Sequence, residues 1–75
     1  MKNIHTIHLE VHGHIYSILE EVVALKNEMN ITTKFKFNGV EVILDKFGYH
    51  DMCYINDYIE IICDSMSKSL NKVYL

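Results

Sequence analysis

The chain has 75 residues, 49% of them hydrophobic, and a formal net charge of −3. This length and composition predict a single domain over residues 1–75 and exclude extensive disorder. No apolar run approaches the ~20 residues needed to cross a bilayer, and the first ten residues lack the pattern of a signal peptide, so we expect a cytoplasmic protein without membrane contact.

The basic residues are all lysines, and proline is absent. Arginine is the preferred residue for reading guanine and for gripping phosphate, so its absence from an acidic chain argues against nucleic-acid binding. We interpret Lys34 and Lys36 as part of a solvated strand face. The bias toward isoleucine, lysine and asparagine, whose codons are A/T-rich, indicates a low-GC bacterium or one of its phages as the source.

Residues 4–12 fit two local structures. As a strand, they place Ile7, Leu9 and Val11 on one face. As a helix running into the next element, they repeat apolar residues every seven positions, at Ile4, Val11, Ile18 and Leu25. Gly13 disfavours the helix and the β-branched residues favour the strand, so we expect a strand.

Residues 14–29 predict an amphipathic helix. Apolar side chains recur at helical spacing, at Ile15, Ile18, Leu19, Val22, Leu25 and Met29. Asn30 follows, and asparagine tolerates the left-handed conformation that ends many helices.

Residues 31–45 predict a β-hairpin around Asn38-Gly39, the dipeptide typical of a type I′ turn. A two-residue loop puts six residues on one face in three cross-strand pairs, Phe37 with Val40, Phe35 with Val42, and Thr33 with Leu44. Lys36 then lies opposite Glu41 on the other face.

Residues 51–72 predict a second amphipathic helix with Asp51 as its N-cap. Its apolar stripe comprises Ile55, Ile59, Ile62, Met66, Leu70 and Val73. The expected fold is therefore a small α+β domain, β-α-β-β-α, with both helices on one sheet face; the alternative is α-β-β-α with a long N-terminal helix. Cys53 and Cys63 would lie ~15 Å apart along this helix, too far for a disulfide, so we expect both to be buried free thiols.

The histidines near the N-terminus raise the possibility of a metal site. On a strand, His8, Glu10 and His12 share one face. On a helix, His8 and His12 are one turn apart. The spacing does not match the HExxH pattern of metalloproteases, so a metal or small-ligand site is the weaker of two functional hypotheses.

No catalytic motif is recognisable. Ser65, Ser67 and Ser69 do not form a nucleophile elbow, and Cys53 has no predicted oxyanion site although His50 lies three residues before it. The isolated glycines cannot form a phosphate loop. We therefore expect a protein that is not an enzyme and needs no cofactor.

Aromatic residues cluster around the start of the second helix, at Phe47, Tyr49, Tyr54 and Tyr58. Tyrosine is enriched at protein interfaces and is also an ordinary half-buried core residue, so both interpretations stay open.

A helix of about 22 residues would span ~33 Å and outreach a small sheet. Its uncovered stripe predicts a homodimer. The expected interface residues are Tyr54, Tyr58, Ile62, Met66, Leu70 and Val73.

Size, acidic charge and the lack of catalytic motifs together indicate a small oligomeric protein that acts by binding another protein. A regulator or inhibitor fits this description, and the residue bias suggests one encoded by a phage or mobile element and directed at a host enzyme or defence system.

Overall fold

The structure is a computed structural model, and it describes residues 6–75. The α+β class and the order β-α-β-β-α are confirmed, and a fourth strand follows them. The elements are β1 (Thr6–Leu9), α1 (Ile15–Met29), β2 (Thr32–Phe37), β3 (Val40–Leu44), the short 3₁₀ helix η1 (Met52–Tyr54), α2 (Ile55–Ser67) and β4 (Lys72–Tyr74).

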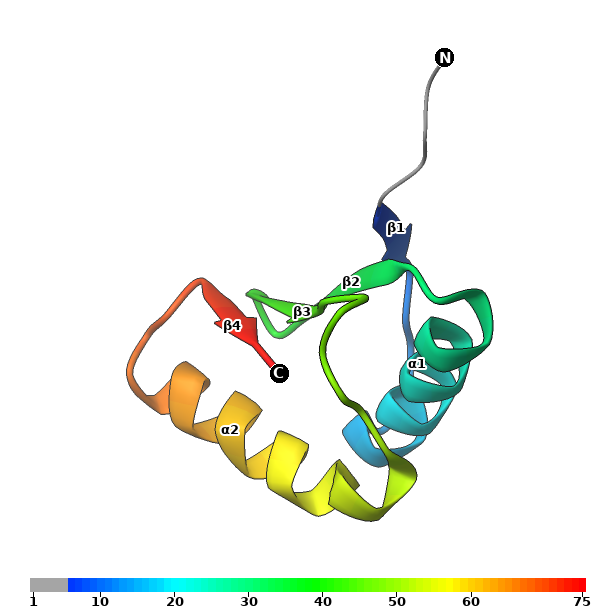
Figure 1. Cartoon of the computed structure of the whole chain (residues 1–75). Helices are drawn as coiled ribbons and strands as arrows, with labels where there is room; N and C mark the ends of the chain where they lie inside the picture. The colour runs from blue at the N-terminus through cyan, green and yellow to red at the C-terminus, as the bar shows by residue number, and fades with distance from the viewer. Residues whose placement is uncertain (1–5) are drawn as a thin grey trace.

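The four strands form one mixed sheet in the order β1-β2-β3-β4. β1 pairs in parallel with β2, β2 pairs antiparallel with β3, and β3 pairs in parallel with β4. Figure 1 shows both helices beneath the same face of this sheet, with the other face uncovered. Among residues 6–75, neither helix is long and apolar enough to cross a membrane.

Residues Thr6–Leu9 are a strand, so the alternative with a long N-terminal helix is wrong. Ile7 pairs with Thr33 and Leu9 with Phe35, which places the apolar positions of β1 on the side that faces the helices. Gly13 has a φ of 114°, a conformation that a helix does not contain and that L side chains rarely adopt. Ile4 and His5 lie outside the described residues.

The hairpin has the predicted register at every pair. Asn38 and Gly39 both have positive φ, 50° and 84°, as a type I′ turn requires. Lys36 lies opposite Glu41 as expected. The Glu41 carboxylate forms its ion pair with Lys72 of β4, whose Nζ lies 3.9 Å from it.

The first helix has nearly the predicted bounds, but Met29, predicted on its apolar face, is 53% exposed. Its inward face contributes Ile18, Leu19, Val22 and Val23 to the core. Asn30 ends α1 in the left-handed conformation, with φ 53° and its backbone N–H donating to the Lys26 carbonyl oxygen.

The second helix is shorter than predicted. α2 ends at Ser67, and Ser69 then adopts a φ of 58°. The N–H of Ser69 donates to the Met66 carbonyl and the N–H of Leu70 donates to the Ser65 carbonyl, the two bonds of a Schellman motif. The chain turns back here, because Val73 can then bury its side chain and pair with Val42 on the open edge of β3.

The topology contains two adjacent β-α-β units. A ferredoxin-like chain has the same element order, but its β-α-β units are split by another strand; here each parallel pair is adjacent. In both units the second strand lies on the same side of the first strand, but the strands of one unit run opposite to those of the other. Both helices cover the same face of the sheet. The two crossovers therefore have opposite hands, so one of them is left-handed, which is rare among proteins.

Candidate functional site

The connection from β3 to α2 carries the most exposed aromatic side chains of the described residues. We call residues 45–54 the aromatic loop. Phe47 is 86% exposed and Tyr49 76% exposed, and both Met52 and Tyr54 are exposed as well. Large apolar side chains on a surface cost solvation free energy, so their concentration in one ten-residue segment points to a binding role.

The first half of the aromatic loop is a tight turn. The Asp45 side chain accepts a hydrogen bond from the Phe47 N–H at 2.9 Å, and the Asp45 carbonyl accepts one from the Gly48 N–H at 2.9 Å. The Lys46 N–H donates to Thr32 Oγ1 on β2 at 3.0 Å. Aspartate commonly starts such turns because its side chain bonds the backbone two residues on. Phe47 is thus held outward at the tip.

Side chains of α1 hold the middle of the aromatic loop. The buried Lys26 ammonium donates to the Gly48 carbonyl oxygen, and the Asn27 amide donates to the His50 carbonyl at 2.9 Å. Burial lowers the pKa of Lys26, while the nearby Asp45 carboxylate acts in the opposite direction. These contacts tie the loop to a helix that is distant in sequence.

His50 is the buried anchor of the aromatic loop, with only 3% of its surface exposed. Its Nε2 lies 2.9 Å from the Leu75 carbonyl oxygen, and its ring packs edge-on against Tyr58 at 5.9 Å between centroids. Burial lowers the pKa of His50 more than the Leu75 bond raises it. A neutral ring protonated on Nε2 donates to Leu75, and Nδ1 then has no hydrogen-bond partner among the described residues.

Asp51 organises the second half of the aromatic loop. Its side chain accepts from the Cys53 N–H at 2.9 Å and from the Tyr49 hydroxyl at 3.3 Å. Its own N–H donates to the Tyr58 hydroxyl at 3.1 Å. The bond from Cys53 lowers the pKa of Asp51, and the Asp51 charge raises the pKa of Tyr49. The predicted capping role of Asp51 is confirmed, although the element it caps is the 3₁₀ helix η1.

The tyrosines of this region form a series of edge-to-face and tilted ring contacts. Tyr49 and Tyr54 meet edge to face at 6.3 Å between ring centroids, and Tyr54 lies 6.4 Å from Tyr58. Tyr58 is buried in the core, whereas Tyr49 and Tyr54 are exposed. The core interpretation is confirmed for Tyr58, and the interface interpretation stays a prediction for the exposed Tyr49 and Tyr54.

Three of the expected interface residues lie in the core of this chain. Tyr58, Ile62 and Val73 are buried among the helices and the sheet, so they are not available to a partner. The other three expected interface residues differ: Met66 is partly buried, while Tyr54 and Leu70 are exposed.

The structure does not bring the predicted metal ligands together. β1 ends at Leu9, so Glu10 and His12 lie beyond the strand that was expected to align them with His8. Among residues 6–75, no group of three histidine, cysteine, aspartate or glutamate side chains could hold a metal ion.

Cys53 also lacks the surroundings of a nucleophile. Its thiol is exposed, and its hydrogen bond with Asp51 is the main cause that raises its pKa. A thiol with a raised pKa is less ionised at neutral pH and less reactive. Cys63, expected to be buried, is exposed on α2.

No protein-family model, curated protein or solved structure matches this chain. The sequence could signal Phe47 and Tyr49 by their position between two elements, but it carried no signal for Lys26 and Asn27, because their contacts with the loop depend on how α1 packs.

Proposed function

We propose that this chain acts by binding another protein, with the exposed side chains of the aromatic loop as the central contacts. The observation that carries the proposal is a rigidly held loop that presents Phe47 and Tyr49 to solvent. Aromatic side chains dominate binding energy at protein interfaces. The role we favour is that of a regulator or inhibitor rather than an enzyme.

Pre-organisation strengthens this argument. Binding orders side chains and loops at a free-energy cost, and a loop already in its bound shape avoids part of that cost. Hydrogen bonds to β2, α1 and α2 hold the backbone of the aromatic loop at successive positions, so this backbone needs little further ordering on binding.

Site-specific photocrosslinking tests the proposal. A photoreactive phenylalanine analogue replaces Phe47 in one variant and Tyr16, an exposed aromatic on α1, in the control. Each is irradiated in a lysate of the cells that encode the chain. We expect a discrete crosslinked protein from position 47 and none from position 16. Equal labelling at both positions would contradict a dedicated site.

Substitution gives the matching affinity test. Phe47→Ala and Tyr49→Ala should each weaken binding of the crosslinked protein at least about tenfold, the scale of an interface hot spot. Phe47→Ala should leave the free energy of unfolding within about 0.5 kcal/mol of the parent, because exposed positions contribute little to stability, whereas Tyr49→Ala also removes the hydrogen bond to Asp51 and should cost about 1 kcal/mol. Tyr16→Ala should change neither quantity.

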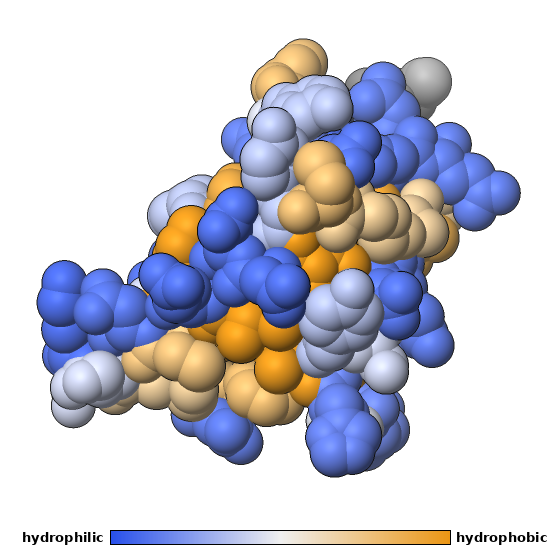
Figure 2. Space-filling view, turned by 90° about the horizontal axis from the view of Figure 1, so that it is seen from below, coloured by the Kyte–Doolittle hydropathy of each residue, from blue (hydrophilic) through white to orange (hydrophobic). Residues whose placement is uncertain are grey.

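Self-association is a second candidate function. Figure 2 looks onto the helical side of the molecule and shows apolar surface along the middle of this face, between polar margins. Partly buried apolar residues from both helices contribute to the edge of the core, among them Ile15, Ile59 and Met66. A second copy covering this face would remove such surface from water.

A further inference from the structure

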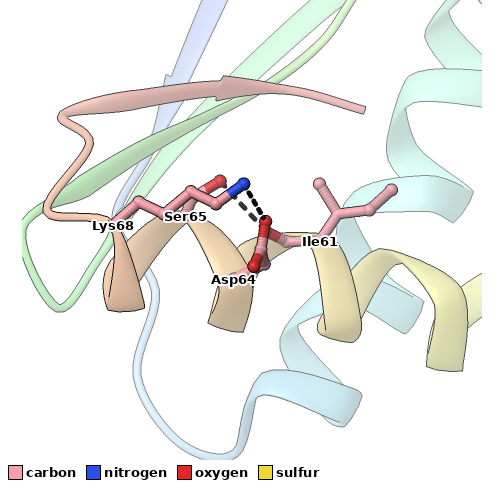
Figure 3. A network of polar contacts seen from close by, with 4 residues as sticks. All are labelled: Ile61, Asp64, Ser65 and Lys68. Atoms are coloured by element: carbon pink, nitrogen blue, oxygen red, sulfur yellow. Dashed lines mark hydrogen bonds and ion pairs between the residues drawn. The ribbon is translucent and has the colours of Figure 1, made fainter.

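We call the space between the outer edge of β4 and the neighbouring side of α2 the β4 groove; the hollow found there is lined by α2 residues alone. A hollow of about 350 Å³ is lined by Glu60, Ile61, Asp64 and Ser65. Figure 3 shows Ile61, Asp64 and Ser65 on the side of α2 that faces the β4 ribbon. The groove is separate from the aromatic loop, which precedes α2 at the helix's other end.

The edge of β4 has free backbone groups. The Asn71 carbonyl accepts from the Glu41 N–H, and the Leu75 N–H donates to the Ile43 carbonyl. The backbone N–H and C=O groups of the odd-numbered residues in and beside β4 therefore point toward β3. Parallel pairing alternates along a strand, hence the N–H and C=O groups of Lys72 and Tyr74 point away from the sheet. Within residues 6–75, no strand lies beyond this edge.

The floor of the groove is apolar. Ile61 is 43% exposed, and the Ser65 hydroxyl is turned back onto the Ile61 carbonyl oxygen at 3.0 Å. That internal bond uses the hydroxyl proton of Ser65, so this side chain offers no free donor to a ligand.

The outer wall of the groove is acidic. Asp64 forms an ion pair with Lys68 at 3.1 Å. Glu60, one turn before Asp64, has no ion-pair partner among the described residues. A positively charged side chain would complement this wall.

We propose that the groove binds an extended segment of another protein, which adds as a strand to β4. On its helix-facing side the segment carries an apolar residue and, two positions away, a lysine or arginine. Main-chain hydrogen bonds to Lys72 and Tyr74 supply the affinity, and the two side chains supply the specificity.

The dimensions of a strand and a helix agree with this arrangement. Side chains two positions apart on a strand are separated by ~6.6 Å. One turn of α2, from Ile61 to Ser65, rises ~6 Å. An apolar side chain on Ile61 therefore brings the next helix-facing side chain over Ser65, from where a lysine stem reaches Glu60 and Asp64.

A defined pentapeptide tests the proposal. The probe is acetyl-Thr-Val-Thr-Lys-Thr-amide, added to the ¹⁵N-labelled full chain up to about 1 mM, the concentration range for weak strand addition. We expect backbone amide shifts at Lys72 and Tyr74 and at the α2 residues 60–65, with slower hydrogen exchange of the two β4 amides. Replacing the peptide's lysine with glutamate, or N-methylating its backbone, should abolish the shifts.

Two variants separate this groove from other surfaces. Ile61→Lys should weaken peptide binding at least about tenfold, whereas Ala24→Lys, an exposed substitution on α1, should not change it. Should Ile61→Lys fail to fold, Glu60→Gln serves instead, with an expected loss of about threefold to fivefold that fades at high salt. Phe47→Ala should leave peptide binding intact.

Several results would overturn the proposal. They are the absence of shifts at Lys72 and Tyr74, equal binding of the glutamate peptide, or loss of binding in Phe47→Ala. Slow exchange of the same two amides in the peptide-free protein, together with a dimeric mass, would assign this edge to a second copy instead.

Discussion

At the scale of single residues, Gly48 has a steric role in the aromatic loop. A Cβ at this position would lie 2.8 Å from Cε1 of His50 and 3.3 Å from the Asp45 carbonyl oxygen. The His50 ring cannot move away easily because it is buried and bonded to Leu75. Because glycine has no Cβ, residue 48 can lie against both the buried His50 ring and the Asp45 carbonyl of the turn.

Gly48→Ala should lower the free energy of unfolding by about 1–3 kcal/mol, the usual cost of overpacking. Urea denaturation measures the change, and Ser17→Ala on the exposed face of α1 is the control. An unchanged denaturation midpoint would contradict the tight contact with His50.

His50 should make stability depend on pH. Its pKa is lowered from 6.5 in the folded protein, mainly by burial, so the unfolded chain binds the proton more tightly. The contribution of neutral His50 to the free energy of unfolding is complete above pH 6.5. It is lost as the pH falls from 6.5 through the pKa that His50 has in the folded protein.

We therefore expect the thermal unfolding temperature to decrease as the pH is lowered from 7.5 to 5. The decrease should be smaller in His50→Gln, which has no ring to charge. His12→Gln, at an exposed position, should follow the parent. A parent and His50→Gln with parallel pH profiles would exclude this role for His50.

At the scale of elements, the end of α2 determines which apolar residues remain for a partner. The Schellman motif at Ser69 turns the chain, so Val73 enters the core as part of β4 while Leu70 stays exposed. A continuous helix would have placed both on one stripe. The short helix removes the original geometric reason to expect a dimer through it.

Val73→Asp and Leu70→Asp should differ strongly in stability. The first buries a carboxylate without a partner and should lower the free energy of unfolding by more than about 3 kcal/mol; the second should cost less than about 0.5 kcal/mol. Chemical denaturation of both variants checks this. Similar losses in the two would favour the longer helix.

At the scale of the whole molecule, one apolar core joins both β-α-β units. It contains residues from α1, β2, β3, α2 and β4. The uncovered sheet face is polar at most of its exposed positions, with His8, Lys36 and Lys72 among them, and Tyr74 is its exposed aromatic side chain. Self-association is therefore expected on the helical side, whose apolar surface Figure 2 displays.

Sedimentation velocity of the full chain checks this expectation. A dimer should form at concentrations above about 10 μM, a range typical of modest interfaces. A monomeric mass at those concentrations would rule out self-association and leave the aromatic loop and the β4 groove as the binding surfaces.

The hairpin and the first helix were predictable because their determinants are local. The Asn38-Gly39 turn and the alternation of apolar residues demand the same register, and Asn30 ends its helix through its own backbone preference. The strand at Thr6–Leu9 was also predicted from local features. β-branched residues favour a strand there, and Gly13 disfavours a helix that would continue into α1.

The fourth strand and the site were not predictable in the same way. The apolar spacing in residues 51–72 fits a helix up to its last residue. Val73 instead lies in β4, because β3 has an open edge with which this strand pairs. The aromatic residues were visible in the sequence, but their division into buried Tyr58 and exposed Tyr49 was not.

The sequence by itself therefore determined the class of the fold, the turn and register of the hairpin, and the position of the first helix, since each depends on neighbours in the chain. Tertiary structure alone decided the end of α2 and the hydrogen bonds that hold the aromatic loop and display Phe47. Those outcomes depend on contacts between distant residues, such as Lys26 with Gly48 and His50 with Leu75, and local pattern carries no information about them.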